Sequence, residues 1–401
     1  MTADTRPGGS FPALDALAHS LAEADAVGLR RRRMEVETGH GAHPVIEGRS
    51  YTAFCSNDYL GLCEHPALAE AAAEGARRYG VGAGASHLVS GHGRVHADLE
   101  HALARFVGAP AVLLFSTGYM ANLAVLTTLA GRGDAIFQDK LNHASLIDAA
   151  LLSRAELKRY PHGDLDALER RLAASSAPTK VIVTDSVFSM DGDLAPLPQL
   201  LGLAERFDAW LYVDDAHGFG VLGPAGAGSV AHFGLRSPRL VYLGTLGKAA
   251  GVCGAFVAGE SAVIEALVQR ARTYIYTTAL PPLIAHVLLR SLELIAAADD
   301  RRARLRSHAE RLRAAAAGFP GALIASDTAI QPLVLGGNHA ALEASRRLRE
   351  RAILVPAIRP PTVPQGTARL RISLSAAHES ADVDALARAL QAIGADAAAG
   401  R

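Results

Sequence analysis

The sequence has few cysteines, no excess of charge of either sign and no long apolar run. Its three cysteines, Cys55, Cys63 and Cys253, lack metal-ligand spacing and are too few for a disulfide framework, which predicts a reducing, cytoplasmic setting without a metal site. The 40 basic residues balance the 40 acidic ones, so no overall field attracts nucleic acid or an anionic membrane. No secretory signal opens the chain, and no apolar stretch approaches the ~18 residues of a membrane span. We therefore expect small-molecule partners.

The chain does have enough hydrophobic sequence for a large core. Half of its 401 residues are hydrophobic and 20% are charged, as expected for an enzyme of one or two closely packed domains. Helical patterns at 165–174 and 197–207 separate short apolar runs that predict strands covered on both faces. These runs are Ala111–Phe115, Val181–Thr184, Leu211–Val213, Leu240–Leu243 and Ala255–Ala258. The pattern predicts an α/β fold with a large, mostly parallel sheet.

Both ends of the chain differ from this body. Residues 13–38, rich in Ala, Leu, Glu and Arg, predict a helix, and the arginines at 30–33 are either its solvated face or face a substrate. After Pro281-Pro282 come two long helical stretches, and then the apolar runs 330–335, 352–358 and 368–374, which predict strands of a smaller α/β layer.

These patterns divide the chain into three expected parts. They are an N-terminal helical arm over 1–47, a large cofactor-binding domain over 48–293 and a small C-terminal domain over 294–401.

Three segments resemble ligand-binding motifs but do not fit them. Gly82–His87 ends in His where a dinucleotide fingerprint needs Gly, and Gly244–Lys248 is too short for a phosphate loop. The carboxylates of Asp185–Asp193 are not spaced like those of a calcium loop, so a tight turn is expected there.

A lysine and an aspartate carry the clearest chemistry. Lys248 follows Gly244-Thr245-Leu246-Gly247, and a lysine amine can condense with an aldehyde to an imine. Asp214 ends an apolar strand, where open α/β sheets place ligand-binding residues, and its carboxylate could hold a pyridine nitrogen protonated. Its neighbour Asp215 should point to the other face of the sheet, because strand side chains alternate. This pair predicts pyridoxal phosphate as the cofactor, with His217 near the ring's phenolic oxygen.

A phosphate site and a ring-stacking residue complete this prediction. Ser116–Tyr119 follows the strand ending at Phe115 and opens a helix, so its free backbone N–H groups form an anion site to which Thr245 adds a hydroxyl. His143, in Asn142-His143-Ala144-Ser145, is a candidate to stack on the ring, although a purely structural histidine remains the alternative.

Together these motifs resemble, over nearly the whole chain, the α-oxoamine synthases. These are fold-type I pyridoxal phosphate enzymes, with the fold of aspartate aminotransferase, that join an amino acid to an acyl thioester with loss of carbon dioxide. The segments that carry the resemblance are Ser56–Gly61, Ser90–His92, Gly118–Tyr119, Asn142–Ser145, Ser186–Asp193, Asp214–Gly218 and Thr245–Lys248.

The resemblance implies roles for individual residues. Lys248 would hold pyridoxal 5'-phosphate as the internal aldimine and then act as general base, with His143 and Asp214 as the other catalytic residues. The implied cofactor-binding residues are Gly118, Tyr119, His143, Ser189, Asp214, His217, Thr245, Lys248, Thr277 and Thr278. The implied substrate-binding residues are Arg31, Asn57, His143, Thr362 and Arg371, of which Asn57 and Arg371 would bind the amino acid carboxylate. Thr277 and Thr278 would reach the phosphate of a second subunit, so a homodimer is expected.

The segment Ala357–Pro364, with Arg359-Pro360-Pro361, indicates the branch of the family. It resembles members that condense L-alanine with a pimeloyl thioester, carried by coenzyme A or by an acyl carrier protein, in biotin biosynthesis. Arg359 is then either a second contact for the pimeloyl carboxylate or a surface salt bridge. The alternatives are a sister enzyme such as 2-amino-3-ketobutyrate ligase (glycine C-acetyltransferase) and, from another class, a ligand-sensing regulator, for which no DNA-binding domain is recognised. Asp185, where relatives often have Glu, and Ala250 are interpreted as packing variation.

Overall fold

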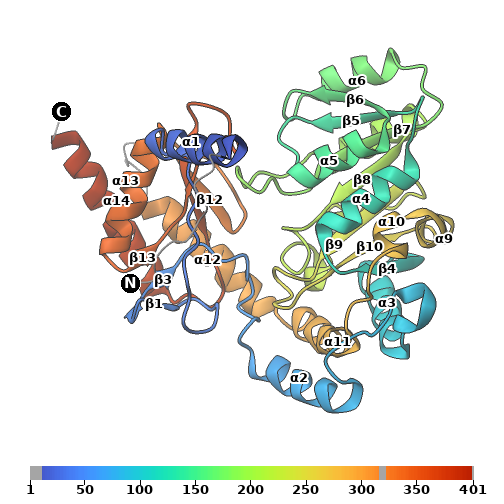
Figure 1. Ribbon diagram of the computed structural model, residues 1–401, viewed down its shortest axis with the longest axis horizontal. Helices are drawn as coiled ribbons and strands as arrows, with labels where there is room; N and C mark the ends of the chain where they lie inside the picture. Colours follow the sequence, from blue (N-terminus) through green and yellow to red (C-terminus); the bar gives the residue numbers. More distant parts are fainter. Residues whose placement is uncertain (1–10, 316–321, 400–401) are drawn as a thin grey trace.

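The computed structural model describes residues 11–315 and 322–399, which form a larger and a smaller half, each built on a β-sheet (Figure 1). The larger sheet has seven strands in the order β4-β10-β9-β8-β7-β5-β6. The strands are β4 (Ala111–Phe115), β5 (Ala135–Asp139), β6 (Glu156–Tyr160), β7 (Lys180–Asp185), β8 (Trp210–Asp214), β9 (Leu240–Thr245) and β10 (Ala255–Gly259). Only β10 runs against its neighbours in this sheet, which confirms the expected mostly parallel arrangement.

Alternation along the strands divides the core into two layers. Leu113, Val183, Tyr212 and Val257 face a layer that also contains helices α4 (Gly118–Leu129), α5 (Ala144–Ser153), α9 (Ser261–Arg270) and α10 (Arg272–Ile275). Their strand neighbours face the other side, against α6 (Leu165–Ala173) and α7 (Leu197–Arg206), or against α2 (Pro66–Tyr79), α3 (Arg94–Val107) and α11 (Pro282–Ala296). The sheet is thus buried on both faces, as near-continuous apolar strands require.

Short elements fill the connections around this sheet. They are a π-helical turn at His87–Gly91, a 3₁₀ turn at Pro224–Gly226 and α8 (Ser229–His232). No helix of the described ranges is long and apolar enough to cross a membrane.

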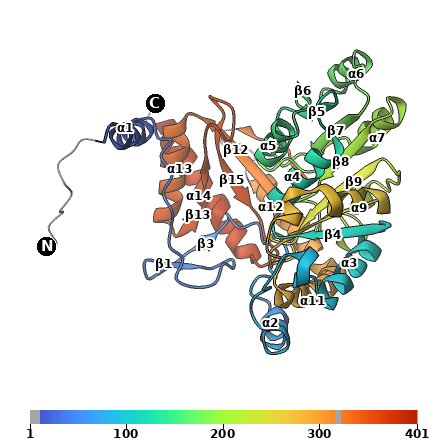
Figure 2. The same ribbon diagram turned by 45° about the vertical axis from the view of Figure 1, so that its right-hand side comes forward.

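The smaller half is built on a four-stranded sheet in the order β11-β12-β15-β14, next to α12 (Asp299–Ala315), α13 (Asn338–Glu350) and α14 (Ser380–Ala399). Its strands are β11 (Ala322–Leu323), β12 (Ile330–Gly336), β14 (Ala357–Ile358) and β15 (Ala368–Ser373). The N-terminal segment belongs with it in space, because β3 (Thr52–Ala53) pairs in parallel with β13 (Ile353–Leu354), and β1 (Val45–Ile46) and β2 (Arg49–Ser50) form a hairpin beside it. Figure 2 shows α1 (Pro12–Ala26) lying beside α13.

Three expectations about local structure were wrong. The N-terminal helix ends at Ala26 rather than 38, so the arginines at 30–33 lie on an irregular segment and not on a helix face. The run 352–358 is not one strand: it divides at Pro356 into β13 and β14, which pair with different strands. Two strands, β5 and β6, were not predicted. β6 is an edge strand with the sequence ELKRY, so it lacks the apolar pattern of the buried strands.

The other predicted elements are confirmed within one or two residues, including the two helices after Pro281-Pro282, which are α11 and α12. We keep the three-part division as a proposal. Its expected boundary after residue 293 falls in the last turn of α11, and residues 52–54, placed in the large domain, pair with strands of the small half.

Candidate active site

The predicted site residues gather along the carboxyl edge of the large sheet. β7 and β8 end side by side at the paired residues Asp185 and Asp214. Ala255, at the start of the antiparallel strand β10, pairs with Thr245 on one side and with Phe115 on the other. The ends of β4, β7, β8 and β9 therefore lie at one edge, which is where open α/β sheets bind ligands.

Lys248 lies three residues beyond β9, with its amine inside the protein. Its Nζ is 3.1 Å from Nε2 of His217. Burial lowers the pKa of Lys248 to about 8, and the nearby carboxylates of Asp214 and Asp185 oppose that shift. A large fraction of the amine is therefore neutral and nucleophilic near pH 8.

His217 connects this lysine to the N-terminal motif. Its Nδ1 lies 2.6 Å from the hydroxyl oxygen of Tyr59, and that hydroxyl donates its hydrogen to Oδ1 of Asn57 at 3.2 Å. Burial, followed by the charges of Lys248 and Arg371, holds the pKa of His217 well below its usual range. A neutral imidazole beside Lys248 adds no positive charge to the site.

Asp214 and Asp215 serve opposite faces of the sheet, as the strand alternation predicted. Asp214 accepts a hydrogen bond from Nδ2 of Asn122 at 2.8 Å and one from the backbone of Ala216 at 3.0 Å. A carboxylate has about four lone-pair sites, so Asp214 keeps capacity for a further donor such as a pyridinium N–H. Asp215 instead accepts from the Tyr242 hydroxyl at 2.7 Å, on the other face.

His143 is the N-cap of α5 and is partly exposed. Its Nδ1 is 2.7 Å from Oγ of Ser145, and its backbone N–H donates to Oδ2 of Asp185 at 2.7 Å. Burial lowers the pKa of His143, although Asp214 opposes the shift. The interpretation of Asp185 as packing variation was wrong, because its carboxylate directly holds the backbone of His143. Burial, followed by the charge of Asp214, raises the pKa of Asp185 well above its usual range.

The start of α4 forms the predicted anion site through its backbone. Thr117 is the N-cap, and its Oγ1 accepts from the backbone N–H of Met120 at 3.2 Å. Within the described residues no acceptor is bonded to the N–H groups of Gly118 and Tyr119, so both can bind an anion. The Tyr119 hydroxyl donates to Asp148, so only the backbone of Tyr119 serves this site. Thr245 is half-buried at the end of β9, two strands from β4 in the sheet, and its hydroxyl is a further donor at this edge.

Asn57, Ser189 and Arg371 meet between the two halves. Arg371, on β15, donates from Nη1 to Oδ1 of Asn57 at 3.2 Å and from Nε to the backbone oxygen of Ser189 at 2.5 Å. The guanidinium is almost fully buried, and Tyr59 lies against its Nη2 at 3.5 Å. The expected carboxylate-binding pair is therefore assembled in the folded chain, beside Ser189.

A second cluster of predicted residues lines a cavity of about 60 Å³ next to β14. Arg31 and Thr362 share its walls with Arg359. Arg359 donates from Nη1 to the backbone oxygen of Gly28, while its buried Nε has no hydrogen-bond partner. Burial, followed by the charge of Arg31, lowers the pKa of Arg359. No carboxylate of the described residues pairs with either arginine, so the cavity is suited to an anion.

Thr277 and Thr278 lie on the segment between α10 and α11. Tyr276 before them is 71% exposed, and the segment is fixed by the Ala279 N–H bonded to the backbone oxygen of Ala85 at 3.0 Å. Their expected contact with a second subunit stays a prediction.

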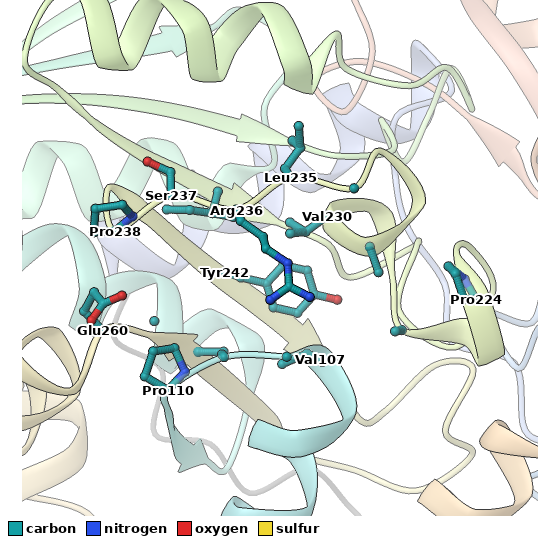
Figure 3. A pocket seen from close by; sticks show the side chains of 18 residues that line it. Val107, Pro110, Pro224, Val230, Leu235, Arg236, Ser237, Pro238, Tyr242 and Glu260 are labelled. Carbon is teal, nitrogen blue, oxygen red and sulfur yellow. The ribbon is translucent and has the colours of Figure 1, made fainter.

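The larger cavity, of about 590 Å³, is elsewhere (Figure 3). It lies at the opposite edge of the sheet, between the end of α3 and the starts of β4 and β9, and Pro110, Leu235 and Tyr242 are among its mostly apolar walls. None of the predicted site residues lines it.

The donor set at the carboxyl edge fits a phosphorylated pyridine aldehyde. A partly neutral lysine amine could hold the aldehyde, an incompletely satisfied carboxylate could accept from the ring nitrogen, and two backbone N–H groups could bind the phosphate. These groups belong to Lys248, Asp214 and the start of α4, as the sequence predicted.

Two residues of this network had no predicted role. Tyr59 lies within a segment that carried the family resemblance, but its contact with His217 spans 158 residues. Asn122 is a buried amide of α4, and its place as a lone polar residue within the apolar run Met120–Leu126 was the available signal.

Comparison with known proteins agrees with a site for a phosphorylated pyridine aldehyde. The family model for aminotransferases of class I and II matches residues 49–390. An 8-amino-7-oxononanoate synthase from Nitrosomonas europaea is 61% identical over 378 residues, which cover 94% of this chain and 98% of that protein.

Solved structures agree in fold. A serine palmitoyltransferase from S. paucimobilis with a bound PLP–myriocin aldimine matches with a TM-score of 0.90 at 30% identity, over 96% of this chain and 98% of that one. An 8-amino-7-oxononanoate synthase from Francisella tularensis matches with a TM-score of 0.77 at 33% identity, over 87% of this chain and 98% of that one. The expected fold class and family are confirmed. The chain belongs to the class I and II aminotransferase family and, within it, to the 8-amino-7-oxononanoate synthases.

Proposed function

We propose that this enzyme condenses L-alanine with a pimeloyl thioester to give 8-amino-7-oxononanoate, carbon dioxide and the free thiol, a step of biotin biosynthesis. The name shared by near-full-length relatives at about 60% identity supports this reaction. The observation that carries it is the adjacency of two anion sites. Arg371, which contacts Asn57, is on β15, and the neighbouring strand β14 lines the Arg31–Arg359 cavity with Ala357 and Ile358.

The cofactor is pyridoxal 5'-phosphate, which supplies an electron sink for negative charge at the substrate's α-carbon when bound. Lys248 would hold its aldehyde carbon and Asp214 its ring nitrogen, while His143 would cover one face of the ring. The N–H groups of Gly118 and Tyr119, with the hydroxyl of Thr245, would hold the phosphate.

The protein's own residues then bind and orient alanine. Arg371 would offer its planar guanidinium to the carboxylate, with the amide of Asn57 as its neighbour. Lys248, with its pKa lowered to about 8, would remove the α-proton as general base. The neutral His217 and the phenol of Tyr59 keep the amine in place without adding charge.

The two arginines of the small cavity would select the acyl substrate. A pimeloyl chain carries a carboxylate at the end opposite its thioester, and a pair of guanidiniums without a protein carboxylate matches that charge. Thr362 would add a hydroxyl. Acyl groups without a terminal carboxylate would leave both arginines unpaired, which disfavours them.

We also propose the partners expected from the sequence. The acyl donor is carried by coenzyme A or by an acyl carrier protein, and two copies form a homodimer in which Thr277 and Thr278 serve the second site. The exposed side chain of Tyr276 at that segment supports such a contact. A cytoplasmic location is supported by the free thiols of Cys55, Cys63 and Cys253.

Thiol release from pimeloyl-coenzyme A tests the reaction. Purified, cofactor-loaded protein is offered L-alanine, glycine or L-serine in parallel, with Lys248→Ala as the blank. We expect release with alanine and none from the blank. Release only with glycine and a short acyl donor would instead indicate a glycine C-acetyltransferase, which shares the catalytic residues and differs in the acyl pocket.

A further inference from the structure

One buried amide connects the two groups that would contact the cofactor ring. Asn122, on α4, donates from Nδ2 to Oδ2 of Asp214 at 2.8 Å and from the same nitrogen to Oγ of Ser145 at 2.8 Å. Ser145 in turn lies 2.7 Å from Nδ1 of His143. Asn122 is 1% exposed and Ser145 is fully buried, so water does not compete for these bonds.

Tyr212 fixes which way the amide points. Its hydroxyl donates to Oδ1 of Asn122 at 2.6 Å, so the carbonyl end of the amide is satisfied on the side away from the carboxylate. The reverse orientation would place Oδ1 against the carboxylate oxygen of Asp214, and two acceptors would then face each other. Both N–H groups of Asn122 are therefore donors, one to Asp214 and one to Ser145.

The orientation of Asn122 determines where the proton of His143 lies. Because Oγ of Ser145 accepts from Asn122, its own hydrogen is free to donate to Nδ1 of His143. The backbone N–H of Ser145 also points at Nδ1, at 3.3 Å. With two donors directed at it, Nδ1 is an acceptor, and the proton of the neutral ring is on Nε2.

We propose that Asn122 is a positioning residue of the active site, which through one side-chain amide orients the carboxylate of Asp214 and sets His143 in its Nε2–H tautomer. The donor fixes Oδ2 of Asp214, and Oδ1, which accepts from the backbone N–H of Ala216, keeps a lone pair for the cofactor nitrogen. The tautomer leaves His143 with a hydrogen-bond donor at Nε2, while Nδ1 faces Ser145. Tyr212 acts through Asn122 in both respects.

Two variants separate this role from simple support of the fold. Asn122→Leu keeps the approximate shape of the side chain and removes every hydrogen bond, and Tyr212→Phe removes only the hydroxyl that orients the amide. Gln138→Leu is the matched control. Its buried amide donates to the backbone oxygen of Leu146 at 2.7 Å, and among the described residues it makes no hydrogen bond to Asp214 or His143.

The two readouts do not require turnover. The first is the tautomer of His143 in the cofactor-free protein, from long-range proton–nitrogen NMR spectra with ¹⁵N-labelled histidine, in which the His143 signal is assigned by its loss in His143→Asn. The second is the affinity of the cofactor-free protein for pyridoxal phosphate, from fluorescence titration. Both remain interpretable if the proposed acyl substrate is wrong, although the proposal rests on the cofactor.

We expect the wild type and Gln138→Leu to show the Nε2–H tautomer, and Asn122→Leu to show a mixture of tautomers. Cofactor affinity should fall about 10- to 100-fold in Asn122→Leu and about 3- to 10-fold in Tyr212→Phe, as for lost hydrogen bonds to a charged group and to its orienting partner. If Asn122→Leu does not fold, Tyr212→Phe carries the test with the same two readouts. An unchanged tautomer, or unchanged affinity, in every variant that folds overturns the proposal, because one amide is required to serve both groups.

Discussion

The amine of Lys248 lies 3.1 Å from Nε2 of His217, whose other nitrogen is 2.6 Å from the hydroxyl of Tyr59. The imidazole is held neutral, because burial lowers its pKa far below the usual range. The lysine is thus buried beside a neutral ring rather than a cation. Desolvation, more than charge repulsion, makes its amine reactive.

The lowered pKa of Lys248 predicts how cofactor loading depends on pH. Only the neutral amine attacks an aldehyde, so the rate at which cofactor-free protein takes up pyridoxal phosphate should rise with pH and level off above a midpoint near 8. Stopped-flow absorbance between pH 6 and 10 measures it. A midpoint near 10.5 would show that the amine is not desolvated. Lys248→Ala should lose both turnover and the lysine adduct that borohydride reduces.

Arg371 should control the binding of the amino acid. Arg371→Lys keeps the charge but loses the fork that contacts Asn57 and Ser189. We expect KM for L-alanine to rise at least about tenfold, since a bidentate carboxylate contact is lost, while KM for the acyl thioester changes little. Steady-state kinetics with each substrate varied in turn measure both. Equal rises in the two KM values would place Arg371 in general support of the site instead.

The sequence was sufficient for residues whose roles follow from local context. Lys248 and Asp214 stand beside strand ends with recognisable neighbours, so their places at the carboxyl edge could be predicted. Asn122 could not be, because its contact with Asp214 joins residues 92 positions apart and depends on how α4 packs over β8. The same holds for Asp185, whose contact with the backbone of His143 depends on where α5 begins.

The secondary-structure predictions were wrong where burial or strand pairing, and not local sequence preference, decides the structure. The stretch after Ala26 has helix-forming residues, but α1 buries none of its side chains and so gains no packing to extend it. β6 was missed because an edge strand can carry charged residues such as Glu156 and Lys158.

The Arg31–Arg359 cavity should determine selectivity for a terminal carboxylate. We expect Arg359→Gln to lower kcat/KM for pimeloyl-coenzyme A by about 10- to 100-fold, the loss of a charge-assisted contact, and to leave heptanoyl-coenzyme A almost unchanged. Arg31→Gln should act in the same direction. Arg33→Gln, on the same irregular segment but outside the cavity walls, is the control. An equal fall in kcat/KM with both thioesters would show that Arg359 does not recognise the terminal carboxylate of the acyl chain.

His162 ties the loop that carries Ser189 to the end of β5. Its Nδ1 lies 3.0 Å from Asp139, and its Nε2 lies 2.8 Å from Asp193. The hydrogen bond to Asp139, followed by the one to Asp193, raises the pKa of His162 to about 10. Because the folded-state pKa is above the ordinary value of 6.5, the protonated ring stabilises the fold fully below pH 6.5, and this stabilisation is lost as pH rises toward 10.

A variant that cannot titrate should reveal that dependence. Against His162→Gln, the melting temperature of the wild type should be higher by several degrees at pH 6, and the difference should shrink steadily toward pH 10, as for a partly exposed ion pair. Calorimetry or circular dichroism at each pH measures it, with His101→Gln, an exposed histidine on α3, as the control. A difference in melting temperature that is constant across the pH range would mean that the ring supports the loop by packing and not by charge. Its packing partner is Phe188, whose ring centroid lies 4.4 Å from that of His162.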